Sequence, residues 1–157
     1  MTEINYLHGD ATQPIGEGPK IIVHVCNDIG GWGKGFVVAI SKRWKEPAAQ
    51  YRQWHQTQVN FTLGEVQFVQ VETDLWIANL IGQHKIGWNE QGKPPIRYEA
   101  VAEGLKKVAG KAKELEAAIH MPRMGCGLAG GRWENIESIV KKELCEKELN
   151  VTVYDYP

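Results

Sequence analysis

The sequence predicts an α/β fold: a mixed sheet of about six strands with helices on both faces. Short apolar runs alternate with longer segments of helical periodicity, in the order β-β-α-β-β-α-β-α-β, and this alternation favours strands joined by crossover helices. The run Ile21–Cys26 is almost entirely apolar, as expected of a central strand with two covered faces. The chain has 157 residues and no internal repeat or Ser/Pro-rich linker, so one domain over residues 1–157 is expected.

Six apolar runs are predicted to be strands. They are Ile4–Leu7, Ile21–Cys26, Val66–Val71, Leu75–Ile81, Ala118–Met121 and Val151–Tyr156. The link between the third and fourth runs, Glu72-Thr73-Asp74, is short and polar. These two strands are therefore expected to form a hairpin, or at least to lie next to each other.

Three segments repeat apolar residues at three- and four-residue steps and are predicted to be helices. They are Phe36–Trp54, Ile96–Ala117 and Trp133–Lys147. Pro47 is expected to break or kink the first, because proline lacks the N–H that a helix interior needs. Pro94-Pro95 precedes the second, where a missing N–H costs little.

Composition and charge narrow the class of partner. The formal net charge is −1, and the chain has no basic tail or run of like charges. Proteins that neutralise many backbone phosphates usually carry a basic face, so dedicated binding of duplex nucleic acid is disfavoured. A short contact with the end of a nucleic acid stays open.

The cysteines and the N-terminus indicate the compartment. Cys26, Cys126 and Cys145 are widely spaced and form no CxxC pair, which predicts neither a disulfide framework nor a zinc knuckle. The start MTEINYLHGD lacks the features of a signal peptide, and no apolar stretch approaches the ~20 residues that span a bilayer. We expect a cytoplasmic protein with no membrane partner, no cofactor, no metal site and a metal-independent chemistry.

A glycine-dense loop follows the strand Ile21–Cys26. It reads Asn27-Asp28-Ile29-Gly30-Gly31-Trp32-Gly33-Lys34-Gly35 and leads directly into a predicted helix. Glycine permits positive φ and close approach of backbone N–H groups to an anion, and the helix start adds unpaired N–H groups and a partial positive charge. These features indicate a phosphate site to which Lys34 adds a full charge. A tight strand-to-helix connection is the simpler alternative.

Two familiar phosphate motifs do not fit this loop. The Gly31-x-Gly33-x-Gly35 spacing differs from the dinucleotide fingerprint, and no strand ending in an acidic residue follows at ~20 residues. Lys34 is followed by Gly35, so the Ser or Thr of a Walker-type loop is missing.

A second loop repeats the same arrangement of strand, glycines and helix start. After Ala118–Met121 the chain reads Pro122-Arg123-Met124-Gly125-Cys126-Gly127-Leu128-Ala129-Gly130-Gly131-Arg132-Trp133. In open α/β sheets ligands collect at the carboxyl ends of the strands. Two such loops, each beginning where a buried strand ends, therefore predict two opposed backbone cradles suited to a diphosphate.

These motifs resemble those of the macro domain family. The resemblance is carried by Gly9-Asp10-Ala11-Thr12, by His24-Val25-Cys26-Asn27 with the first glycine loop, by Met121–Leu128 with Trp133-Glu134, and by the ending Val151-Thr152-Val153-Tyr154. It covers nearly the whole chain, in order. The most similar branch holds the yeast ADP-ribose 1''-phosphate phosphatase and the human terminal ADP-ribose glycohydrolase. The resemblance implies a three-layer α/β/α sandwich that binds ADP-ribose.

The resemblance also implies ligand-binding roles. Asp10, with Ala11 beside it, would accept a hydrogen bond from the adenine amino group, or else be a surface turn residue. Asn27 would contact the distal ribose, or else cap its own turn. Tyr154 is a candidate to stack on adenine, and equally a packing residue. The loop residues expected at the ligand are Gly31, Trp32, Gly33, Lys34, Gly35, Gly125, Cys126, Gly127, Leu128, Ala129 and Gly130.

Catalysis is assigned to His24 and Asn27. His24 lies in an apolar strand and by itself reads as a core histidine. The phosphatase's corresponding strand also carries a histidine three residues before its asparagine, which implies a general acid or nucleophile here. By strand alternation His24 and Cys26 share a face, and Asn27 takes the other unless the following turn re-aims it. A nucleophilic role for Cys126 is a further, weaker reading.

One departure from the family bears on activity. The glycohydrolase branch uses a lysine after the fourth strand and an aspartate in the second loop. This chain has Gln83-His84-Lys85 in the first place and Ala129 in the second, so the lysine route loses its partner and Gln83 is the better candidate for substrate contact. Three functions stay open: a hydrolase of ADP-ribose 1''-phosphate, a non-catalytic reader of ADP-ribose or of ADP-ribosylated protein or nucleic-acid ends, and a domain for another nucleotide.

Overall fold

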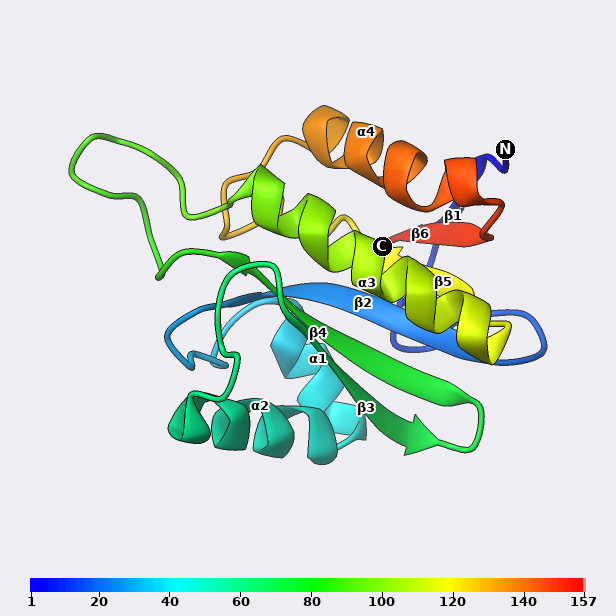
Figure 1. Ribbon diagram of the computed structural model, residues 1–157, viewed down its shortest axis with the longest axis horizontal. Helices are drawn as coiled ribbons and strands as arrows, with labels where there is room; N and C mark the ends of the chain where they lie inside the picture. The colour runs from blue at the N-terminus through cyan, green and yellow to red at the C-terminus, as the bar shows by residue number, and fades with distance from the viewer. Residues whose placement is uncertain (157) are drawn as a thin grey trace.

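The computed structural model describes residues 1–156 and has one six-stranded sheet between two layers of helices (Figure 1). The strands are β1 (Ile4–His8), β2 (Lys20–Asn27), β3 (Val66–Glu72), β4 (Leu75–Gln83), β5 (Ala118–Pro122) and β6 (Val151–Asp155). Their order across the sheet is β1-β6-β5-β2-β4-β3. All neighbours are parallel except β3 and β4, which form an antiparallel hairpin. The predicted mixed sheet, its hairpin and the α/β/α sandwich are confirmed.

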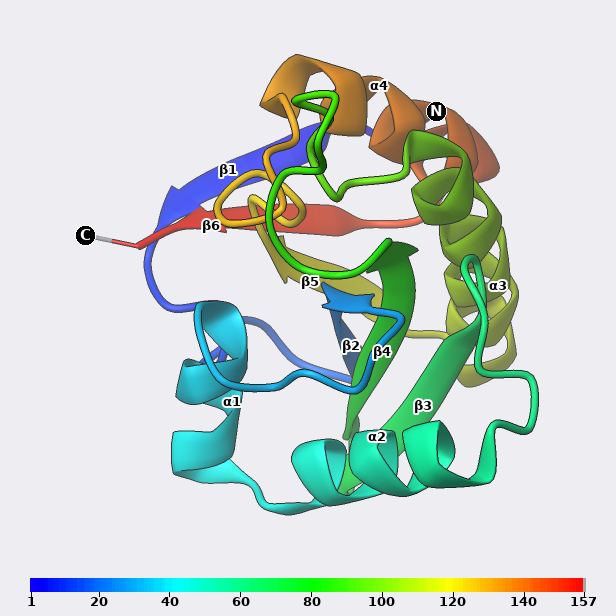
Figure 2. The same cartoon turned by 90° about the vertical axis from the view of Figure 1, so that its left-hand side faces the viewer.

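The helices divide between the two faces of the sheet, as Figures 1 and 2 show. The first face is covered by α1 (Phe36–Arg43) and α2 (Glu46–Thr57). The second is covered by α3 (Tyr98–Leu115) and α4 (Trp133–Glu143), which continues into the short 3-10 helix η1 (Cys145–Lys147). No helix within residues 1–156 is long and apolar enough to cross a membrane.

The predicted break in the first helical segment is present, but it precedes the proline. Trp44 is extended, with φ −139° and ψ 139°, and Pro47 lies in the first turn of α2. Proline is tolerated in a first turn because its missing N–H has no intrahelical partner there. Pro47 therefore begins a second helix and does not bend the first.

Strand β2 lies at the centre of the sheet and contributes side chains to the hydrophobic cores on both of its faces. Ile21 and Val23 pack against α3 and α4, whereas Ile22 and Cys26 pack toward α1 and α2. The pairing of β2 with β4 shifts register between Cys26 and Asn27, and an irregularity of this kind re-aims the side chain that follows. As a result Asn27 faces α2, where Tyr51 binds it.

Candidate functional site

The two glycine loops lie at the same edge of the sheet. They follow β2 and β5, which are adjacent and parallel, so their carboxyl ends meet. Figure 2 looks onto this edge, with the loops after β2 and β5 facing the viewer. A Cβ atom placed on Gly35 in the first loop would lie 3.9 Å from the Leu128 side chain in the second. The loops therefore oppose each other, as predicted.

An inner hollow of about 240 Å³ lies between the loops. Its lining is His24, Val25, Lys34, Gly35, Phe36, Val37, Gln83, Pro122, Arg123, Met124, Gly125, Gly127, Leu128 and Ala129. Two of these residues, Lys34 and Arg123, are cationic, and none carries a carboxylate. A lining with positive charge and backbone amides favours an anion.

An outer hollow of about 620 Å³ adjoins the inner one, because Gly35, Phe36 and Pro122 line both. Its other lining residues are Gly9, Asp10, Ala11, Thr12, Ala39, Lys42, Arg43, Tyr154 and Tyr156. Aromatic walls and a few polar groups are typical of a site for a flat heterocycle. Together the two hollows form a site whose one end suits a base and whose other end suits an anion.

Most glycines of the two loops are required by the conformation of the chain itself. Gly30, Gly35, Gly125 and Gly130 have φ between 76° and 85°, a region that residues with a Cβ atom rarely adopt. A Cβ atom on Gly131 would overlap the carbonyl oxygen of Gly125. These five positions support the simpler reading of tight strand-to-helix connections.

The conformation of the chain does not require a glycine at Gly33 or Gly127. Neither has positive φ, and a Cβ atom at either position would meet no atom within 4 Å. Because glycine costs conformational entropy on folding, a glycine without an internal need points to something outside the chain that approaches the backbone. One such position occurs in each loop.

The helix starts add donors to both loops. Neither α1, with Gly35 as its N-cap, nor α4, with Arg132, has a side chain capping its first turn. First-turn N–H groups have no intrahelical partner and carry part of the helix dipole. The start of α1 lines both hollows through Phe36, so the N–H groups of its first residues lie where the base end meets the anion end.

Asp10 is held as an ionised acceptor in the outer hollow. Its Oδ1 accepts hydrogen bonds from the Thr12 N–H at 2.8 Å and the Thr12 hydroxyl at 2.7 Å, and its Oδ2 lies 3.7 Å from the Arg43 guanidinium. Partial burial by itself would raise the pKa of Asp10, but the Thr12 hydrogen bonds and the Arg43 charge outweigh it and lower the pKa. An acceptor-only side chain there suits an amino group.

The Asn27 side chain folds its own loop. Its Oδ1 accepts from the N–H groups of Ile29 and Gly31 at 3.1 and 2.9 Å and from the Tyr51 hydroxyl at 2.9 Å, while its Nδ2 donates to Gly31 O at 2.8 Å. This is the turn-capping arrangement that we gave as the alternative. A contact between Asn27 and a distal ribose stays a prediction.

His24 has the surroundings of a core histidine. It is 1% exposed, and its ring packs against Trp32 and Phe36. Its Nε2 lies 2.6 Å from the Asn79 side-chain oxygen. Because Asn79 Nδ2 donates elsewhere, to Pro47 O and Gln67, Nε2 carries the proton and donates.

This burial sets the charge of His24. Desolvation lowers its pKa to about 4, against the smaller opposing effect of the Asn79 hydrogen bond, so the ring is neutral at pH 7. His24 borders the inner hollow, and its catalytic role stays a prediction. Cys26 shares its face, as alternation predicted, with Sγ 3.8 Å from Nε2.

Gln83, the last residue of β4, and the two residues after it line different hollows. Gln83 lines the inner hollow, and its Nε2 donates to Lys85 O at 2.9 Å. His84 and Lys85 line a different hollow, of about 470 Å³, formed by residues 84–97. Asp28 binds both of them: its Oδ2 lies 2.7 Å from His84 Nδ1, and its Oδ1 accepts from the Lys85 N–H at 2.7 Å.

The second loop presents backbone groups to the inner hollow rather than reactive side chains. The Ala129 carbonyl accepts from the Ile96 N–H at 3.0 Å, and its side chain is only a methyl group. Partial burial raises the pKa of Cys126, against the opposing charge of Arg123. A thiol with a raised pKa is a poor nucleophile, and Cys126 does not line the inner hollow.

The two aromatic residues predicted to contact the ligand lie in different environments. Tyr154 lines the outer hollow although only 4% of it is exposed, and its hydroxyl accepts from the Ile15 N–H at 3.0 Å. Trp32 lines neither hollow; it packs in the core against Tyr51 and His24 and donates to Ser41. Its place at the ligand stays a prediction.

The predicted ligand residues thus fall into two sets. The structure brings together around the hollows Asp10, Ala11, Lys34, Gly35, Gln83, Gly125, Gly127, Leu128, Ala129 and Tyr154. Asn27, Gly31, Trp32, Gly33, Cys126 and Gly130 lie in the loops without lining either hollow.

Sequence reasoning missed several lining residues. Phe36, Ala39 and Arg43 line the outer hollow from α1, and their three- and four-residue spacing marks one helical face. Arg123 lines the inner hollow and pairs with Asp155, with Nε 2.5 Å from Oδ1. Its position directly after a buried strand, at the start of the second loop, is the signal that could have found it.

Solved structures of other proteins resemble this chain along almost its whole length. A protein of unknown function from Bacteroides thetaiotaomicron is 61% identical, with a TM-score of 0.97 and 98% of each chain covered. A macrodomain protein from Streptomyces coelicolor is 51% identical, with a TM-score of 0.88, over 99% of this chain and 100% of the other. The chain belongs to the macro domain family. No protein-family model matches it.

Curated relatives of this macro domain are more distant. The mouse chromodomain-helicase-DNA-binding protein 1-like is 32% identical over 99% of this chain, which spans only 18% of that protein's length. The Candida albicans ADP-ribose 1''-phosphate phosphatase is 29% identical over 88% of this chain and 92% of its own length. The second relative is thus similar to the macro domain over almost its entire length.

Proposed function

We propose that this macro domain binds ADP-ribose and hydrolyses an ADP-ribose derivative, with ADP-ribose 1''-phosphate as the first candidate substrate. The observation that carries the binding is the pair of joined hollows. The outer one has aromatic walls and Asp10, and the inner one has two glycine loops, two cations and no carboxylate. Adenosine fits the chemistry of the first, and a diphosphate fits that of the second.

Hydrolysis is supported by the similarity to the Candida albicans phosphatase. In such a reaction water attacks phosphorus, the bond to the ribose oxygen breaks, and inorganic phosphate and ADP-ribose leave. Because His24 is almost completely buried and its Nε2 is committed to Asn79, a positioned water is a better attacking group than its imidazole.

A non-catalytic reader is the second candidate. Two observations favour it: Ala129 supplies no carboxylate to the inner hollow, and His24 has its Nε2 committed to Asn79. A reader would use the same hollows for ADP-ribose carried on a macromolecule. Glycohydrolysis by the lysine route has less support, because Lys85 does not line the inner hollow.

One pair of measurements separates these functions. The wild-type protein is titrated calorimetrically with ADP-ribose, ADP, AMP and ADP-ribose 1''-phosphate, and the last mixture is followed by phosphorus NMR. The proposal expects tighter binding of ADP-ribose than of AMP, and release of inorganic phosphate. Binding without phosphate release assigns the reader. No binding of ADP-ribose at millimolar concentration overturns both.

His24 is tested in the same assay. His24→Ala that binds ADP-ribose like the wild type but releases no phosphate would place the histidine in the reaction. Unchanged phosphate release would remove His24 from the mechanism and leave the step to the positioned water.

A further inference from the structure

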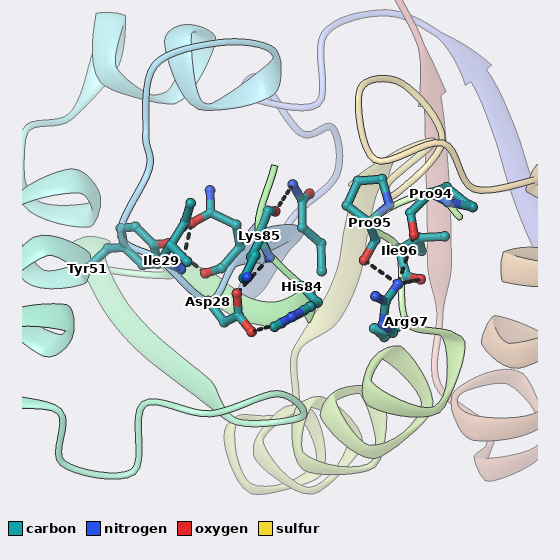
Figure 3. Close-up of polar contacts among 11 residues, drawn as sticks. Asp28, Ile29, Tyr51, His84, Lys85, Pro94, Pro95, Ile96 and Arg97 are labelled. Atoms are coloured by element: carbon teal, nitrogen blue, oxygen red, sulfur yellow. Dashed lines mark hydrogen bonds and ion pairs between the residues drawn. The ribbon is translucent and has the colours of Figure 1, made fainter. Parts of the chain in front are cut away.

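The segment from His84 to Arg97, here called the β4–α3 segment, has a closed and well-braced stem. The His84 N–H donates to Pro95 O at 2.8 Å, and the Arg97 N–H donates to Gly82 O at 2.8 Å. The Arg97 guanidinium also donates to the carbonyls of Pro94, Pro95 and Ile96 at 2.8, 3.1 and 2.9 Å (Figure 3). The two ends of the segment are therefore fixed to each other and to β4.

The β4–α3 segment contacts the second glycine loop. The Ile96 N–H donates to Ala129 O at 3.0 Å. A Cβ atom on Gly130 would lie 2.7 Å from Pro94 Cβ and 3.1 Å from the Trp88 ring. Figure 2 shows the segment crossing in front of this loop.

Asp28 connects the same segment to the first glycine loop. Its carboxylate binds the Lys85 N–H and His84 Nδ1, both at 2.7 Å, and its side chain is only 15% exposed. Ile86 lies close to the first loop as well, since a Cβ atom on Gly31 would be 2.8 Å from Ile86 Cδ1. The segment thus bridges both loops, with Asp28 as its polar link to the first.

The residue that Asp28 holds has an unusual backbone. Lys85 has φ 59°, a left-handed conformation that the Cβ atom of a lysine disfavours. Such a conformation persists only where its surroundings fix it. The two contacts from the Asp28 carboxylate, to the Lys85 N–H and to the preceding side chain, supply that fixation.

The Lys85 carbonyl in turn orients a residue of the inner hollow. It accepts the hydrogen bond from Gln83 Nε2 at 2.9 Å, and Gln83 lines the hollow between the glycine loops. With Nε2 bound to Lys85, the amide oxygen is the group that Gln83 presents as an acceptor. A ribose hydroxyl attached beyond a diphosphate is a donor of matching chemistry.

We propose that Asp28 is a positioning residue for the distal ribose of the ligand. Its carboxylate fixes the left-handed Lys85 peptide, and that peptide fixes the Gln83 amide. This inference rests on the proposed binding of ADP-ribose. It predicts that Asp28 matters for ADP-ribose and not for ADP, which has the same adenosine and diphosphate but lacks the distal ribose.

The first test compares the two ligands by calorimetry. Asp28→Ala is expected to weaken ADP-ribose binding about tenfold, the order of one or two lost hydrogen bonds, while ADP binds within about twofold of the wild type. Asp74→Ala, in the distant β3–β4 turn, is the matched control and should change neither. Retained ADP binding also shows that the variant is folded.

The second test is a double-mutant cycle with Lys85→Gly, because glycine adopts positive φ without the Cβ penalty. The loss caused by Asp28→Ala should fall from about tenfold to within about twofold in the Lys85→Gly background. If Asp28 had only a structural role, Lys85→Gly would not restore the affinity that Asp28→Ala loses.

Three results would overturn the inference. They are unchanged ADP-ribose binding by Asp28→Ala, equal weakening of ADP and ADP-ribose, and an undiminished loss in the Lys85→Gly background. If the wild-type protein itself fails to bind ADP-ribose, the proposed function fails first, and the two failures are thereby told apart.

Discussion

At the scale of single residues, the glycines of the two loops do different work. Gly131 and the positive-φ glycines are required by the chain's own geometry, whereas Gly33 and Gly127 are not. Sequence alone counts all of them as one signal, because spacing does not reveal φ or the space around a missing Cβ. The structure separates the ones that shape the loops from the ones that leave the backbone open.

Valine at Gly33 or Gly127 is therefore expected to block the ligand and spare the fold. A branched side chain at Gly127, which lines the inner hollow, or at Gly33, next to Lys34 of that lining, would narrow the approach of the diphosphate to the backbone. ADP-ribose affinity should therefore fall about tenfold or more. Thermal unfolding should shift little, because neither side chain meets another atom. Gly110→Val, equally open but on α3 and away from both hollows, provides the control for the calorimetric comparison. Normal affinity in both loop variants would refute the cradle.

The site residues show how far sequence reasoning reaches. Asp10, Lys34 and Gln83 were predicted at the ligand, and the structure brings them to the two hollows. Burial makes His24 neutral, and its Nε2 is bound by Asn79, 55 residues away in the chain. No local pattern announces such a partner, so the choice between catalytic and core histidine could not be made from the strand alone.

At the scale of elements, apolar periodicity predicted all six strands within two residues at each end. The predicted helices Ile96–Ala117 and Trp133–Lys147 are observed as Tyr98–Leu115 and as α4 followed by η1. Sequence could not locate the break in Phe36–Trp54, because the extended Trp44 precedes the proline that signals it. The β4–α3 segment was also missed, since its hydrogen bonds join residues far apart in the chain.

Two glycines of α3 make a matched pair for testing how this helix packs. A Cβ atom on Gly104 would overlap the Leu80 side chain of β4, whereas one on Gly110 would meet nothing. Alanine raises helix propensity at both sites by about 1 kcal/mol. Gly110→Ala should therefore raise the free energy of unfolding by about 0.5–1 kcal/mol. Gly104→Ala should lower it by about 1–3 kcal/mol through overpacking.

Urea unfolding of the two variants measures this difference. Stabilisation by Gly104→Ala would mean that α3 sits farther from β4 than the structure indicates. Equal effects at the two positions would also mean that α3 does not pack against Leu80 as closely as the structure indicates.

At the scale of the whole molecule, two buried histidines link stability to pH. Desolvation lowers the pKa of both His24 and His120 to about 4, from 6.5 in the unfolded chain. Between these values the unfolded state binds more protons, so stability is fully present above about pH 6.5 and is lost as the pH falls toward 4. Each histidine accounts for up to about 3 kcal/mol.

The free energy of unfolding in urea, measured at pH 7, 5.5 and 4.5, tests this linkage. It should fall across the series, and His24→Gln, which keeps a donor for Asn79 but does not titrate, should reduce the slope. A flat profile in the wild-type protein would show that neither histidine is buried as described.

We propose that the backbones of two opposed loops hold the diphosphate of ADP-ribose, and an NMR titration of the ¹⁵N-labelled protein can locate the ligand on both. Amide signals of residues 33–37 and 125–130 should move most on addition of ADP-ribose, while those of the β3–β4 hairpin stay in place. Changes confined to one loop, or centred away from both, would show that the two loops do not hold the diphosphate together.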